Sequence, residues 1–182
     1  MREVPMESMF EEIFTRNRCT DFRWIEPSGI RVAHWVRMKC HYGCGGYGAC
    51  AACPPETPSV AECREFFREY SRAALFHFRL RLDGPDERYA ACRAINRQLL
   101  SVERDVFLAG EERSFALFAD NCSWCDECAG ERRICRNKKD SRPTIEAMGV
   151  DVYSLARGAG YHIEVCVDDR QAMDRFGLLL IR

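Results

Sequence analysis

Apolar residues recur at the spacing of an amphipathic helix in several stretches of the chain. The clearest case is the N-terminal stretch, where Met6, Met9, Phe10, Ile13 and Phe14 fall on one helical face. Ser59 is a suitable N-cap for a second helix, and Gly110 stands where a long third helix would end. Helices are therefore predicted over residues 6–17, 59–72, 85–109, 143–148 and 151–158.

Shorter apolar runs bounded by turn residues predict strands between these helices. Residues 22–38 are expected to form two extended pieces around a Pro-Ser-Gly turn, and further strands are expected over 74–82, 114–120, 161–168 and 176–182. Strands and helices alternate along most of the chain, and the last two strands are expected to pair as a hairpin. The pattern predicts one domain over residues 1–182, of the α/β (α+β) class, with helices packed on a central mixed sheet.

Composition narrows the functional classes. The 182 residues carry 27 basic and 28 acidic side chains, a formal net charge of −1, so no overall basic field favours nucleic acid or a membrane surface. The charged N-terminus does not resemble a signal peptide, and no apolar stretch is long enough to span a membrane. A cytoplasmic, reducing compartment is expected. There, the 12 cysteines are better suited to bind metal than to form disulfides.

One run of cysteines has a spacing that is typical of iron–sulfur proteins. Cys122, Cys125 and Cys128 are separated by two residues each, and Cys135 follows after six intervening residues. Bacterial ferredoxins use the same repeated spacing to hold a [4Fe–4S] cluster. The alternative is tetrahedral Zn²⁺, although zinc sites more often consist of two separated cysteine pairs. The spacing favours iron–sulfur, with Cys135 as the fourth ligand.

A second run, Cys40, Cys44, Cys50 and Cys53, is less regular and rich in glycine. It lacks the Cys-x3-Cys-x2-Cys spacing of radical-SAM enzymes, since Tyr47 occupies the third position. Cys50 and Cys53 are followed by Pro54 and not by histidine, which excludes c-type haem attachment. A thioredoxin-like pair formed by Cys50 and Cys53 stays open as an alternative. The favoured interpretation is a second metal site.

Together these two runs resemble the DUF2284 family of predicted metal-binding proteins, from about residue 34 to the C-terminus. The first motif of that family falls on Cys40, Cys44, Tyr47, Gly48 and the segment 53–55. The second falls on Cys122, Cys125, Cys128 and Cys135-Arg136. The sequence departs from the family pattern in the three-residue spacing before Cys44 and in Cys50, which is an additional thiol. The resemblance implies metal binding.

No motif for a phosphate loop, an activated nucleophile or a metal hydrolase is found, so no catalytic residue is predicted. The first hypothesis is an iron–sulfur protein of anaerobic metabolism that carries one or two [4Fe–4S] clusters and exchanges electrons with a redox partner protein. That partner is expected to dock on the basic segment 132–139. The alternatives are a zinc-binding structural or interaction module and an enzyme whose cluster has an open iron. Cys63, Cys92 and Cys166 are expected to be small core residues.

Overall fold

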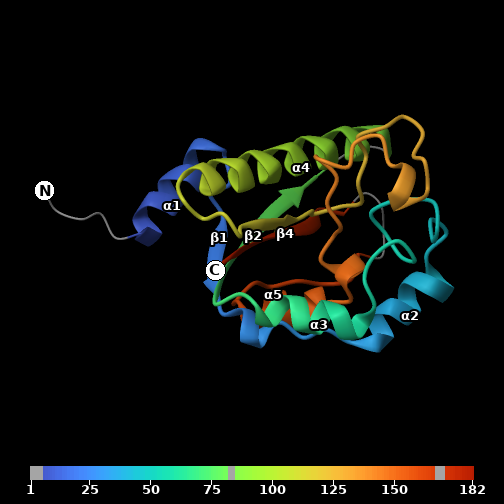
Figure 1. Ribbon diagram of the computed structural model, residues 1–182, viewed down its shortest axis with the longest axis horizontal. Coiled ribbons are helices and arrows are strands. Elements are labelled where there is room, and N and C mark those ends of the chain that lie inside the picture. Colours follow the sequence, from blue (N-terminus) through green and yellow to red (C-terminus); the bar gives the residue numbers. More distant parts are fainter. Residues whose placement is uncertain (1–5, 82–84, 167–170) are drawn as a thin grey trace, which may run out of the picture.

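The fold is built on a four-stranded sheet with the strand order β1-β2-β4-β3 (Figure 1). The computed structural model describes residues 6–81, 85–166 and 171–182. Its strands are β1 (Phe22–Ile25), β2 (Arg72–Leu80), β3 (Phe115–Leu117) and β4 (Met173–Ile181). Helices and strands alternate over most of the chain, which confirms the α/β (α+β) class.

The sheet itself differs from the mixed sheet that was expected. All three strand pairings are antiparallel, and the one parallel pairing within the described ranges is an isolated bridge between Phe118 and Thr144. The prediction of a C-terminal hairpin is wrong, because residues 161–166 do not form a strand. The rest of that predicted strand, residues 167–168, lies outside the described residues. Instead β4 pairs with β2 and β3, two strands that are distant in sequence.

Both faces of the sheet are covered, because apolar residues fill both sides of the central strands. Along β2, Ala73 and Leu75 face one core while Ala74 and Phe76 face the other, as the two-residue period of a strand requires. The first core also contains residues of α3 (Val60–Arg68) and α5 (Val152–Gly158). The second contains residues of α1 (Met6–Arg16) and α4 (Pro85–Leu108). Figure 1 shows α4 on one side of the sheet and α3 and α5 on the other.

Local sequence accounts for how several helices begin and pack. Ser59 and Glu62 form a capping box at the start of α3, which confirms the predicted N-cap. α4 lies close to β4 at Gly177, where an added Cβ would be 2.5 Å from Cδ1 of Leu99. Only a glycine allows this approach without displacement of the leucine.

Residues 34–43 form a helix, α2 (His34–Gly43), where the second extended piece was expected. Valine and aromatic residues in this stretch favour a strand, but the nearest strand-like pairing among the described residues is an isolated bridge at Val32, just before the helix. The helix buries Val36, and the Arg37 guanidinium donates hydrogen bonds to the carbonyls of Pro58 and Ala147, at 3.0 and 3.1 Å. Tertiary contacts therefore override the local preference.

Both cysteine segments lie at the same end of the molecule. α2 leads into the first, and the segment after β3 forms the second, beyond the N-terminal end of α4 (Figure 1). None of the described helices has the length and apolar character needed to cross a membrane.

Candidate metal centre

Two segments about seventy residues apart in the sequence meet in the structure. The Ala51 N–H donates to the Cys128 sulfur at 3.4 Å, and the Cys50 thiol donates to the Cys122 carbonyl at 3.8 Å. Further along, the Arg132 N–H donates to the Glu56 carboxylate at 2.8 Å. The segments 44–59 and 118–142 are thus held side by side by backbone and side-chain hydrogen bonds, without a shared strand pairing.

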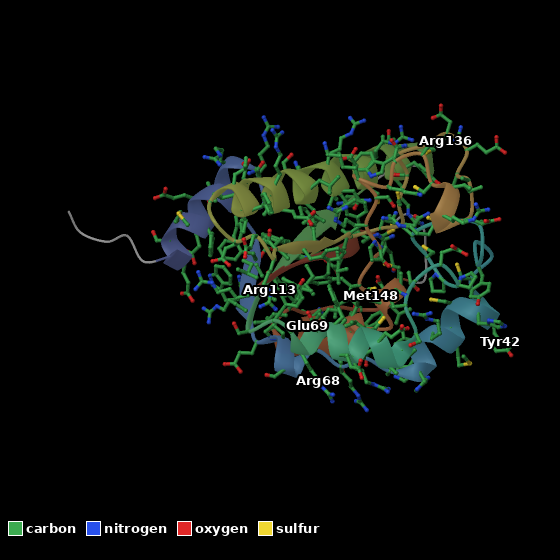
Figure 2. The ribbon with its side chains drawn as sticks, viewed as in Figure 1. Tyr42, Arg68, Glu69, Arg113, Arg136 and Met148 are labelled. Carbon is green, nitrogen blue, oxygen red and sulfur yellow. The ribbon has the colours of Figure 1, made fainter. Side chains whose placement is uncertain are left out.

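Glycines permit this close approach. Gly48 and Gly130 have φ values of +76° and +77°, a region that side chains with a Cβ rarely adopt. A Cβ added at Gly130 would lie 3.7 Å from the Gly48 carbonyl oxygen, so the two glycines mark a point of contact between the segments. In Figure 2, Tyr42 on α2 and Arg136 on the second segment lie at this same end, among several sulfur atoms.

The first cysteine group comprises Cys40, Cys44, Cys50 and Cys53. Cys40 lies in the last turn of α2 and Cys44 caps that helix, so two of these thiols are positioned by a helix and not by a loop. All four line one cavity of about 530 Å³, a size suited to a small ligand. This cavity is also lined by four charged side chains, Arg88, Asp120, Glu146 and Arg175.

The second cysteine group comprises Cys122, Cys125, Cys128 and Cys135, and these four line a much smaller cavity of about 20 Å³. That volume corresponds to about one water molecule. Cys50 lines this cavity as well, so it belongs to both groups. The Asn137 side-chain amide donates to the Cys125 sulfur at 3.0 Å. The Trp124 indole lines the same cavity and donates to the Asp140 carbonyl at 2.7 Å.

A hydrogen bond between their thiols gives Cys50 and Cys53 very different pKa values. The Cys53 thiol donates to Cys50, and this bond, with help from the Ala52 N–H and the Cys128 thiol, lowers the pKa of Cys50 to about 6. The same bond raises the pKa of Cys53, and burial and the negative charges of nearby thiolates raise it further. Burial also raises the pKa values of Cys40 and Cys122. Cys50 is therefore the thiol of its pair that ionises first, and the thiolate is the form that binds metal.

The donor atoms are of the chemical type that a sulfur-preferring metal binds. Eight cysteines surround two adjoining cavities, and a backbone and a side-chain N–H point at two of the sulfurs, as is usual around metal-bound thiolates. The thiols are spread over the cavity walls. Within residues 6–81, 85–166 and 171–182, no three His, Cys, Asp or Glu side chains are grouped closely enough to hold one ion.

The other cysteines and His41 line neither of these two cavities. Cys63 and Cys92 are buried in the core, as expected, and so is Cys19, where burial raises the thiol pKa to about 12. Cys166 was expected in an apolar strand, and that prediction is wrong: it is exposed, in a segment without strand structure. The His41 ring packs against Tyr42 and Tyr47, with ring centroids 4.5 and 4.7 Å away.

Sequence reasoning missed two contributors to the site. Asn137 follows Cys135 within a charged stretch, and nothing in its spacing predicts a bond to Cys125. The Ala51 N–H was equally hidden, because backbone donors carry no residue-specific signal. The alanines beside Cys50 gave one usable hint, since Ala51 and Ala52 are buried and small enough to let the two segments approach.

Fold and site together define a cysteine-rich α/β protein. A comparison with protein families matches residues 23–181 to the family described as predicted metal-binding protein (DUF2284). The chain belongs to this family, as its two cysteine motifs predicted. No curated protein and no solved structure gives a significant match to the chain.

Proposed function

We propose that this protein is an iron–sulfur protein that transfers electrons in anaerobic metabolism, with the second cysteine group holding a [4Fe–4S] cluster and the first group holding a second cluster. The observation that carries the proposal is that the two groups adjoin at Cys50, which lines both cavities. With two adjoining clusters, an electron can enter the protein at one cluster and leave it from the other. When bound, such clusters supply one-electron oxidation and reduction without catalytic side chains.

Several residues of the chain would adjust the behaviour of such a centre. Hydrogen bonds from Asn137 to Cys125 and from Ala51 to Cys128 stabilise negative charge on the sulfurs, which raises a reduction potential. The partly buried Trp124 ring covers the second group and limits access of water. Both effects serve an electron carrier.

A second candidate function is a structural zinc site at the second cysteine group. The cavity of about 20 Å³ favours it, because a single ion needs far less room than a cluster. Zn²⁺ accepts four cysteine thiolates. Under this alternative the second group would fix the loop 122–135 against α4, and the chain would serve as an interaction module.

Reversible redox titration separates the two candidates. Protein purified without oxygen should lose visible absorption on reduction by dithionite, develop an EPR signal, and recover its absorption on reoxidation. Cys125→Ser should change this signal, whereas Cys63→Ser, a matched change at a core cysteine, should leave it intact. A colourless protein without a signal in any redox state would contradict the iron–sulfur proposal and support zinc.

A further inference from the structure

A groove runs along the exposed side of α4, next to the second cysteine group. It has a volume of about 660 Å³, and it lies between the helix and the segment 137–142. Its basic side chains are Arg97 and Arg104 from the helix and Lys139 and Arg142 from the segment. Its acidic side chains are Glu103 and Asp140.

The groove has an excess of free positive charge. Arg142 is paired with the buried Glu103 at 3.1 Å, so this ion pair contributes little field. The remaining basic side chains that line the groove are Arg97, Arg104 and Lys139, and all three are exposed. The remaining acidic side chain in its lining is Asp140. Two aromatic rings accompany these charges. Phe107 is 51% exposed, and Cζ of Arg97 lies over the Trp124 ring, 5.6 Å from its centroid. A basic surface with exposed aromatic rings suits an acidic protein partner.

Only one layer of side chains separates the groove from the second cysteine group. Trp124 and Asn137 line both the groove and the cysteine cavity. Asn137 also touches the Cys125 sulfur, at 3.0 Å. A partner seated in the groove would thus be one residue away from a metal-binding sulfur.

The basic segment 132–139, which the sequence favoured for docking, is partly engaged elsewhere. The Arg132 guanidinium donates to the Ser141 hydroxyl and the Lys138 carbonyl, at 2.9 and 3.0 Å. The Arg136 guanidinium donates to the Glu127 carbonyl at 2.6 Å. These arginines hold the loop together, whereas no side-chain hydrogen bond from Arg104 or Lys139 is found among the described residues.

We propose that this groove, formed by α4 and the segment 137–142, is the docking site of an acidic electron-transfer protein that exchanges electrons with the second cysteine group through Asn137 and Trp124. This inference rests on the proposed iron–sulfur function. The partner's carboxylates would face Arg97, Arg104 and Lys139, and a single electron would pass between the partner's redox cofactor and the cluster, reducing one as the other is oxidised.

The test measures the rate at which a reduced acidic plant-type ferredoxin reduces the anaerobically purified protein in a stopped-flow instrument. The double variant Arg104→Glu/Lys139→Glu is compared with Arg31→Glu/Arg68→Glu, which makes the same change in net charge away from the groove. Arg68 lies on α3, across the sheet from α4 (Figure 2). The groove variant should react about tenfold more slowly at low ionic strength, with a smaller difference at high salt, and the control should react nearly as fast as the unmodified protein.

Iron and sulfide contents are measured first, because they distinguish a failure of the proposed function from a failure of the docking site alone. Unmodified protein without iron would overturn the proposed function and this inference with it. An iron-containing protein whose groove and control variants react equally fast would overturn the docking site alone. Tight, groove-dependent binding of a single-stranded oligonucleotide, with an unchanged ferredoxin rate in the groove variant, would also overturn it and assign the groove to nucleic acid.

Discussion

Replacement of Asn137 by leucine should lower the reduction potential of the proposed cluster at the second cysteine group. The leucine is similar in size but cannot donate the hydrogen bond that Asn137 makes to the Cys125 sulfur at 3.0 Å. A hydrogen bond to a charged group contributes about 1.5–3 kcal/mol, and sulfur is a weak acceptor. The hydrogen bond is present in both oxidation states of the cluster. Because the reduced cluster is more negative, the bond stabilises it more than the oxidised cluster, by about 1 kcal/mol. For one electron this corresponds to about 40 mV.

The assay is an EPR-monitored redox titration of the anaerobic protein. Asn121→Leu is the matched control, because it makes the same replacement beside Cys122 at a residue whose side chain makes no hydrogen bond to a sulfur among the described residues. Iron content should be equal in the two variants and the unmodified protein. A potential that is unchanged in Asn137→Leu, or that shifts equally in both variants, would refute the role given to this hydrogen bond.

Three further predictions concern stability and metal ligands. Arg142→Met should reduce the free energy of unfolding by about 3 kcal/mol in urea titrations, because it leaves the buried Glu103 carboxylate without its partner. The double variant with Glu103→Leu should recover most of that loss, and no recovery would contradict the reasoning. Cys50→Ala should lower the iron content, since Cys50 lines both cysteine cavities. Unchanged iron, sulfide and EPR spectrum would show that this thiol is spare, and would favour a three-cysteine cluster with an open iron. Cys128→Ser should lose metal while Cys92→Ser, in the core, should keep it. Equal loss in both would contradict the assignment.

Local patterns predicted the parts of the fold that depend on local physics. Helical spacing of apolar residues located α1 and α4, and the predicted N-cap at Ser59 located the start of α3. The strand pairings could not be predicted in the same way, since β4 pairs with two strands distant in sequence. α2 was missed because its β-favouring residues are held in a helix by contacts of Val36 and Arg37 with other parts of the chain.

The candidate site was predictable in its residue types but not in its arrangement. Spacing alone marked the eight cysteines as metal-binding candidates. It could not tell that the two groups adjoin, because that depends on how the segments 44–59 and 118–142 pack. The position of Cys50 between the groups and the bond from Asn137 to Cys125 follow from the same packing.

Elemental analysis of anaerobically purified protein is the most direct test of the central claim. Iron, acid-labile sulfide and zinc should be measured per chain on the same sample, without exposure to oxygen, because zinc can replace a lost cluster at thiolate sites. The account predicts iron and sulfide in equal amounts, sufficient for one or two [4Fe–4S] clusters, and little zinc. Stoichiometric zinc without iron or sulfide would contradict it.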